Sequence, residues 1–161
     1  MACLPHTPGL PFSVSAAGTS LNLPQSTQRA NQVKSNVAIL GGAGPNQSYF
    51  DPLAFAAVTT PTFGNAGYDS LRGPGSFNID SGVFREFAVT ERWKVQFRAE
   101  ALNVTNTPHF SNPNGNVSSL VQNADGSVRS LGGYTVITST TGVGREGIDE
   151  RMFRLGLRVT F

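Results

Sequence analysis

The chain has 161 residues, of which 39% are hydrophobic and only 14% are charged, and its formal net charge at pH 7 is +2. A nucleic-acid-binding surface would need basic residues clustered on one face, but the arginines here are scattered and only two lysines occur, so we expect no nucleic-acid partner. The 18 glycines and 10 prolines interrupt helices, and the single cysteine, Cys3, allows neither an internal disulfide nor a cysteine-based metal site.

The sequence contains neither a candidate membrane-spanning helix nor an export signal. No run reaches the roughly 18 apolar residues of a transmembrane helix. The N-terminal segment, residues 1–12, lacks the basic start and the apolar core of a secretory signal. We therefore expect either a cytosolic protein or a fragment whose signal lies upstream.

The first predicted strand, residues 11–16, is a weak one, in which Phe12 and Val14 alternate with two serines. A long loop, residues 17–76, follows and is rich in glycine, proline, asparagine, serine and threonine. Structureless loops of this length are unusual inside compact domains. The aromatic residues of the loop either stack on a ligand or hold the loop together, and they are Tyr49, Phe50, Phe55, Phe63 and Tyr68.

The second predicted strand spans residues 77–87. Its first part alternates apolar with polar residues from Phe77 to Val83, as expected for a strand with one buried and one exposed face. Phe84 then breaks the alternation, which we interpret as a bulge or as the approach of the strand end. A short polar turn, residues 90–92, leads to the next strand.

The third predicted strand, residues 93–103, keeps the alternation from Trp93 to Ala101. Apolar residues occupy the odd positions from Trp93 onward. Polar or charged residues occupy the even positions Lys94, Gln96, Arg98 and Glu100. A second long loop, residues 104–147, follows; its His109 is predicted to be a surface histidine, because no metal-ligand spacing surrounds it, and we expect no metal or cofactor.

The last predicted strand, residues 151–161, has the clearest pattern. Its even positions include Arg154 and Arg158, and its odd positions form an apolar face made of Phe153, Leu155, Leu157, Val159 and Phe161. A C-terminal phenylalanine preceded by apolar residues at every second position resembles the β-signal of outer-membrane barrels. We therefore interpret these five residues as a signal for the barrel-assembly machinery.

These patterns predict an all-β fold of antiparallel amphipathic strands from a transmembrane β-barrel with long outer loops. Strands of roughly 9–11 residues can cross a membrane at a tilt, and short turns opposite long loops are typical of outer-membrane barrels. We expect residues 151–161 to pair with 93–103, which pairs with 77–87 on its other edge. About four strands cannot close a barrel, which needs at least roughly 8, so the isolated chain is expected to be incomplete.

The register of this sheet determines which residues meet lipid. A shift of one residue would turn two arginines of the last strand into the bilayer, so we expect the apolar face toward lipid and the opposite face toward the lumen. Opposite charges paired across such strands contribute roughly 0.2–1 kcal/mol each. The residues expected to face the lumen, against a plug or water, are Lys94, Gln96, Arg98, Glu100, Arg154 and Arg158.

A series of segments sharpens this interpretation. It consists of YFDPLAFAAV at 49–58, FGNAG at 63–67, LRGPGSFNID at 71–80, VFREFAVTERWKVQFRAEALNVTNTPHFSNPN at 83–114 and RMFRLGLRVTF at 151–161. The series resembles the C-terminal barrel strands of TonB-dependent receptors, particularly the Oar-like group. The resemblance implies a barrel of about twenty-two strands around a plug, energised through a TonB complex that acts on the plug.

The resemblance implies a location in the outer membrane, with membrane lipid, the barrel-assembly machinery and the remainder of the receptor barrel and plug as partners. The chain contains no plug, so we expect it to be a piece of the wall that does not transport by itself. The alternative is a soluble β-sandwich module for carbohydrate binding or adhesion, which would show many short, evenly spaced strands. We do not expect an enzyme, because no catalytic cluster or nucleophile motif is present.

Overall fold

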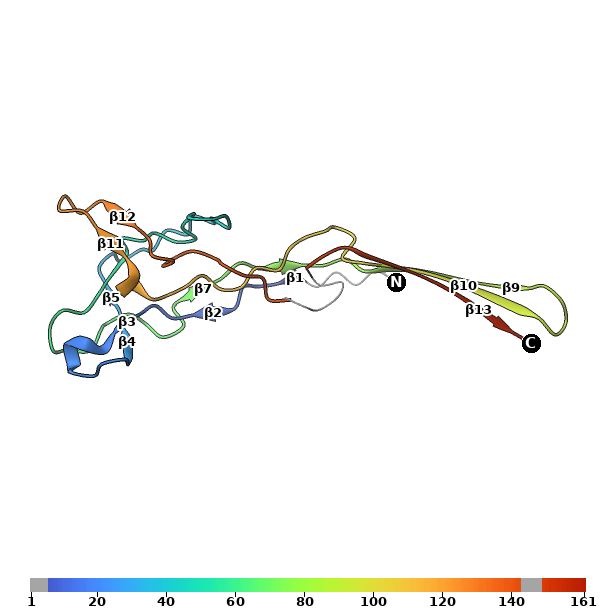
Figure 1. The fold of residues 1–161 in the computed structure, drawn as a ribbon, viewed down its shortest axis with the longest axis horizontal. Helices are drawn as coiled ribbons and strands as arrows, with labels where there is room; N and C mark the ends of the chain where they lie inside the picture. The colour runs from blue at the N-terminus through green and yellow to red at the C-terminus, as the bar shows by residue number, and fades with distance from the viewer. Residues whose placement is uncertain (1–5, 143–148) are drawn as a thin grey trace. The chain divides into compact units, whose positions relative to one another are not determined.

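A computed structural model describes residues 6–142 and 149–161 (Figure 1). Cys3 and the end of the second predicted loop, residues 143–147, lie outside the described residues. The described part is all-β: it consists of strands, turns and two single-turn 3-10 helices, η1 (Gly18–Leu21) and η2 (Val117–Ser119), with no α-helix. None of its helices is long and apolar enough to cross a membrane.

The chain divides into two compact units. The strand unit comprises Met1–Pro8, Gly75–His109 and Thr140–Phe161. The loop unit comprises Gly9–Pro74 and Phe110–Ser139, and so takes most of both segments that were predicted as long loops.

The strand unit is built on one antiparallel sheet with the strand order β13-β10-β9 (Figure 1). The strands are β9 (Ser81–Ala88), β10 (Lys94–Leu102) and β13 (Met152–Thr160). This order confirms the predicted pairing, in which the third predicted strand lies between the second and the last. A two-stranded pair, β1 (His6–Thr7) with β8 (Ser76–Phe77), completes the unit, so the predicted strand 77–87 is divided between β8 and β9.

The register of the sheet is continuous. Val95 lies opposite Val159 on one side and Phe87 on the other, and every odd residue of β10 meets an odd residue of its neighbours. Because side chains alternate between the two faces of a strand, all odd residues share one face and all even residues share the other. Phe84 is neither at a bulge nor at the strand end, as the two predicted alternatives had it, because the β9–β10 ladder runs without interruption past Phe84 to Ala88.

The two ends of β10 are fixed by local hydrogen bonds. At one end the predicted turn 90–92 is closed by the backbone N–H of Val89, which donates to the Trp93 carbonyl at 2.9 Å. At the other end Asn103 adopts φ 47°, a left-handed conformation that asparagine tolerates better than most residues and that ends the strand. Its backbone N–H donates to the Asp80 carboxylate at 2.9 Å, and its side chain bonds the backbone of Thr107.

The loop unit contains short antiparallel pairs instead of long strands. They are β2 (Pro11–Phe12) with β7 (Leu71–Arg72), β3 (Ser15–Ala17) with β4 (Thr27–Arg29), β5 (Asn31–Gln32) with β6 (Phe55–Ala56), and β11 (Val121–Gln122) with β12 (Val128–Ser130). The single strand predicted at 11–16 is therefore two separate strands with different partners. Segment 17–76 carries several of these pairs, so it is folded and not structureless.

The hydrophobic core of the loop unit is centred on Phe50, which is fully buried. Its ring lies 5.8 Å from Phe12, 6.1 Å from Phe55 and 5.5 Å from Tyr134, the last two in edge-to-face geometry. Such pairs add about 0.5–1.5 kcal/mol beyond the burial of their surface. Residues distant in sequence thus hold this unit together. Burial raises the pKa of Tyr134, and the charge of Asp51 raises it further.

Candidate functional site

The odd-numbered face of the three-stranded sheet is apolar and exposed. Leu155 and Leu157 are 77% and 70% exposed, far more than apolar side chains in a folded core. Phe153, Leu155, Leu157 and Val159 of the predicted assembly signal lie on this face, and the Phe161 ring packs 5.4 Å from the Trp93 ring beyond the end of β13. A contiguous apolar face of this kind marks a surface that contacts lipid or another protein.

The dimensions of this face match a bilayer. Phe153 and Phe161 are eight residues apart, which is about 27 Å along a strand. At the tilt of about 40° that barrel strands adopt, this corresponds to about 20 Å along the membrane normal, within the roughly 25 Å apolar band of an outer-membrane barrel. The Trp93–Phe161 pair at the turn end occupies the place where such barrels carry aromatic residues at the interface.

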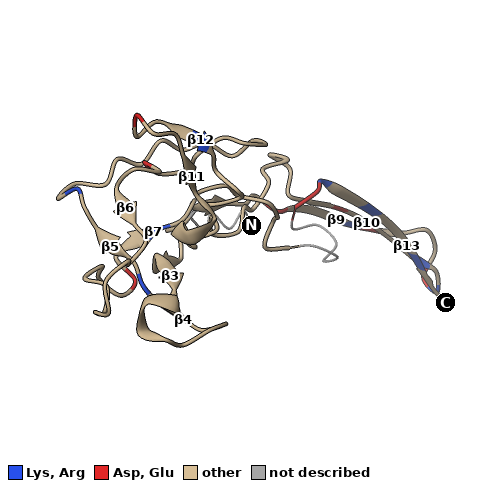
Figure 2. Cartoon of the chain, turned by 60° about the vertical axis from the view of Figure 1, so that its left-hand side comes forward, with Lys and Arg blue, Asp and Glu red and all other residues tan. Residues whose placement is uncertain are grey.

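Charged residues occur along all three strands of the same sheet (Figure 2), and the register places all of them except Arg85 on the even-numbered face. All six residues predicted to face the lumen lie on it, which the register shows by pairing Gln96 with Arg158 and Glu100 with Arg154. Lys94 also forms a diagonal ion pair with Glu86 at 3.7 Å. Exposed pairs of this kind contribute about 1 kcal/mol or less, so they make the face polar without holding the sheet together.

Residues 4–147 match the family described as the outer membrane beta barrel domain. The chain belongs to this family. The match covers most of the chain, including β9, β10 and the described loop unit. No curated protein and no solved structure matches the chain. In the barrel domain, an exposed apolar face backed by a charged face is the expected chemistry of a wall segment.

Sequence reasoning missed how the barrel domain accommodates Phe84. Phe84 lies on the polar face, where its ring covers Gly82: a Cβ at Gly82 would be 3.1 Å from the Phe84 ring. The Arg98 guanidinium also lies over the Phe84 ring, 4.9 Å from the ring centre. The aromatic ring therefore shields an exposed glycine backbone and pairs with a cation, which explains an apolar residue on this face.

Sequence reasoning also missed Arg85. It lies on the apolar face opposite Phe97, and its guanidinium is 5.2 Å from the centre of the Phe87 ring. The signal was present in the sequence: without a bulge at Phe84, the alternation of β9 places Val83, Arg85 and Phe87 together. A bulge at Phe84 would have moved Arg85 to the other face, so the apolar-face position of Arg85 was not predicted.

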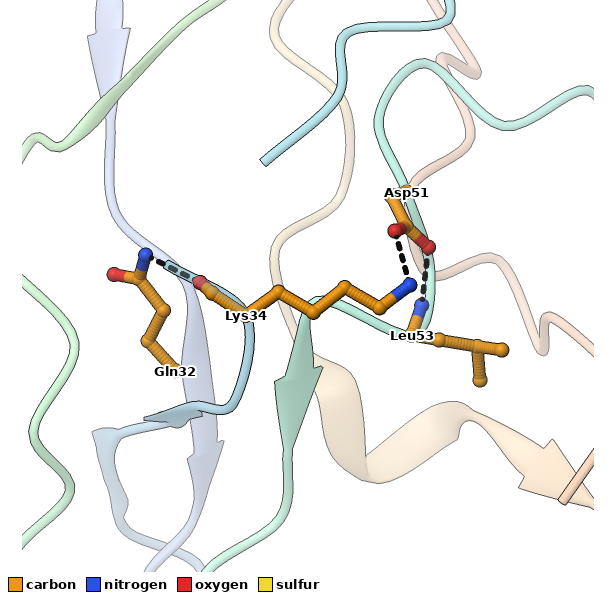
Figure 3. Close-up of polar contacts among 4 residues, drawn as sticks. All are labelled: Gln32, Lys34, Asp51 and Leu53. Carbon is orange, nitrogen blue, oxygen red and sulfur yellow. Dashed lines mark hydrogen bonds and ion pairs between the residues drawn. The ribbon is translucent and has the colours of Figure 1, made fainter. Parts of the chain in front are cut away.

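The loop unit of the barrel domain contains one ion pair, Lys34 with Asp51, supported by backbone groups (Figure 3). The backbone N–H of Leu53 donates to Asp51 at 2.9 Å, and the Gln32 side chain donates to the Lys34 carbonyl at 2.9 Å. Partial burial alone would raise the pKa of Asp51. The hydrogen bonds from Lys34 and Leu53 and the lysine charge outweigh this effect and hold the pKa below its usual range.

The aromatic residues of the first predicted loop divide into two groups. Tyr49, Phe50 and Phe55 are buried in the core, so they hold the loop unit together. Phe63 and Tyr68 are 76% and 79% exposed and stay available for contacts.

The prediction that His109 is a surface histidine is wrong. It is buried, its backbone N–H donates to the Asp149 carboxylate at 3.2 Å, and its carbonyl accepts from Thr141. This burial could not be inferred from a loop sequence, because it depends on the return of the chain at Thr140. Among residues 6–142 and 149–161, no three acidic, histidine or cysteine side chains are placed to hold a metal ion.

Proposed function

We propose that this chain forms part of the wall of a TonB-dependent outer-membrane transporter of the Oar-like kind that its sequence resembles. The observation that supports this proposal most strongly is the three-stranded sheet, in which one continuous register gives a mainly apolar face and a mainly polar, charged face. The odd face contacts membrane lipid, and the even face, with Arg98, Glu100 and Arg154, lines the lumen against a plug. The assembly machinery recognises β13.

The isolated chain is not competent for transport, in this proposal. Among the described residues, β9 and β13 each pair with one neighbour of the three-stranded sheet, which leaves two open edges. Unsatisfied backbone groups in lipid cost several kcal/mol each, and closed barrels need at least roughly 8 strands. The remaining barrel strands and the plug therefore complete the wall, and the TonB complex acts through that plug. No catalytic step is assigned to this chain.

The loop unit serves, in this proposal, as the folded part outside the membrane and supplies the ligand contacts. Its exposed aromatic side chains, Phe63 and Tyr68, and a hollow of about 470 Å³ beside β12 are available for such contacts. The lining of this hollow combines apolar side chains with the polar groups of Asn46, Ser48 and Arg129. These groups favour a polar ligand over a purely apolar one.

Two experiments test the proposal. Expression of the chain followed by fractionation should place it in membranes or inclusion bodies, extractable only with detergent or denaturant; a soluble, cooperatively folding monomer would contradict the wall assignment. Sequencing of the genomic DNA upstream of Met1 should show an in-frame plug and barrel. A stop codon directly upstream, with no plug gene beside it, would contradict the transporter assignment while leaving the barrel family untouched.

A soluble β-sandwich binding module would pack two sheets face to face over a shared core. In the described residues the three-stranded sheet has no such partner on its apolar face, where Leu155 is 77% exposed. The wall segment therefore accounts for the sheet better than the sandwich does.

A further inference from the structure

Arg85 is the single charged residue among the strand positions of the apolar face. Its neighbours in the same row are Phe97 of β10 and, one strand further, Leu157 of β13. None of the ion pairs of the described residues includes it. A cation at the lipid midplane of a barrel costs about 2–4 kcal/mol, falling to about 0–1 kcal/mol near the interface, so its position along the strand decides whether it is tolerated.

Arg85 lies in the middle row of the apolar face, level with Leu157, and its side chain is directed toward the turn end. Arg85 is two rows of side chains from the Trp93–Phe161 pair, which is about 14 Å along the strand and about 10 Å along the normal of a tilted sheet. Its guanidinium lies over Phe87, which is one row closer to the turn. Arginine buries its apolar stem in this way while its charged head reaches the interface.

We propose that Arg85, together with Phe87 and the Trp93–Phe161 pair, binds the phosphate of an anionic phospholipid at the turn end of the sheet. This inference rests on the membrane placement proposed above. The guanidinium presents a planar fork of donors that matches phosphate oxygens, and the Phe87 ring holds that fork from one side. Trp93 and Phe161 occupy the headgroup level, where amphipathic aromatic side chains are stable.

The pattern of chemistry along the face selects a lipid over a protein partner. From the turn inward, the rows carry an aromatic pair, then Phe87, then Arg85. The two rows beyond carry no charge and are apolar except for Ser81. A phospholipid has the same order, with a charged phosphate followed by two apolar chains. A protein partner would have to bury an acidic side chain against this face without further polar groups to satisfy it, which is costly.

The sole tryptophan of the chain, Trp93, reports on this site directly. The full chain is diluted from urea into vesicles of phosphatidylcholine, or of an equimolar mixture of phosphatidylcholine and phosphatidylglycerol, at one ionic strength. Trp93 emission should shift to the blue with both, at lower lipid concentration with the anionic mixture. Arg85→Leu should reduce the preference for the anionic mixture about five-fold, the effect of one basic residue at a charged membrane surface, and Arg85→Lys should keep most of it.

Arg158→Leu is the matched control, because it removes the same charge one row away on the opposite face and should leave the preference close to that of the unaltered chain. Equal losses for Arg85→Leu and Arg158→Leu, or no loss for Arg85→Leu, would overturn the site. Displacement of the anionic vesicles by millimolar inorganic phosphate, against potassium chloride at the same ionic strength, would assign the site to free phosphate. No change in Trp93 emission with either vesicle would instead contradict the membrane placement, and with it the proposed function.

Discussion

The loop unit and the strand unit of this chain place their apolar side chains in opposite ways. In the loop unit, Phe50 and Tyr134 are fully buried, and short strand pairs surround them. In the strand unit, Leu155 and Leu157 are exposed on regular strands whose hydrogen bonds are complete in the middle of the sheet. The first unit carries its own core, whereas the second leaves its apolar face exposed, and in the proposed function membrane lipid covers this face. The predictions below test this difference.

The largest effect is expected from Phe50→Ala in the loop unit. Removing a fully buried aromatic ring that contacts three others should destabilise this unit by about 3–5 kcal/mol. Hydrogen exchange measured by mass spectrometry in detergent solution should show loss of protection in peptides from 49–58 and 130–137. In the same detergent solution, the exposed Leu157→Ala should change the exchange of these peptides very little. Comparable losses of protection for both substitutions would remove the distinction between the units.

The next effect concerns the two faces of β13. In a full-length parent receptor, Leu157→Arg should impair membrane assembly, because an arginine on the lipid face costs about 2–4 kcal/mol. Arg158→Leu, one residue away on the other face, should be tolerated. Heat-modifiable migration of the folded barrel on a gel measures assembly for both variants. Equal tolerance would show that the faces are assigned the wrong way round.

A smaller effect is expected from pH in the loop unit. The pKa of Asp51 is lower in the folded state than in the unfolded chain, so this carboxylate contributes stability above its unfolded pKa, and the contribution is lost as pH falls through the folded pKa. Because the Lys34 side chain is 47% exposed, we expect solvent to limit the contribution to about 1 kcal/mol or less.

Urea unfolding of the loop unit, followed near neutral pH and at acid pH, measures this contribution. Asp51→Asn should be less stable than the unaltered chain near neutral pH and lose less stability on acidification. An identical pH dependence for both proteins would show that the ion pair does not contribute.

The smallest effect is expected from Phe84→Leu on the polar face. This change removes the ring that lies under Arg98, a contact worth about 0.5–1 kcal/mol where it is exposed to solvent. Denaturation of the detergent-solubilised chain should detect a decrease of this size. An increase in stability would indicate that the Phe84 ring destabilises the sheet.

The long strands could be predicted because their chemistry is local. β10 alternates from Lys94 to Ala101 and β13 from Phe153 to Thr160, which defines the faces, and the short turn defines their antiparallel neighbour β9. The faces of β9 are harder to predict from the sequence. Phe84 lies on the polar face and Arg85 on the apolar face, each opposite to the face that its chemistry suggests. A bulge would have restored the alternation, but the Gly82 backbone and the Arg98 cation stabilise Phe84 in place.

The loop unit could not be predicted from local patterns. Its strands are two or three residues long, too short to show a period, and its core joins Phe12, Phe50 and Tyr134 across more than one hundred residues of chain. Tyr49 and Phe63 are equally aromatic in the sequence, yet one is buried and the other exposed. Only the tertiary contacts distinguish them.

The most direct test of the central claim measures which face of β13 meets lipid. In a full-length parent receptor that carries Cys3→Ser, single cysteines at 154–159 are spin-labelled, and the receptor is reconstituted in vesicles for accessibility measurements with oxygen and a water-soluble nickel chelate. Labels at Leu155→Cys, Leu157→Cys and Val159→Cys should be accessible to oxygen, and those at Arg154→Cys, Gly156→Cys and Arg158→Cys to the chelate. The same accessibility at odd and even positions would contradict the assignment of this sheet as a membrane wall.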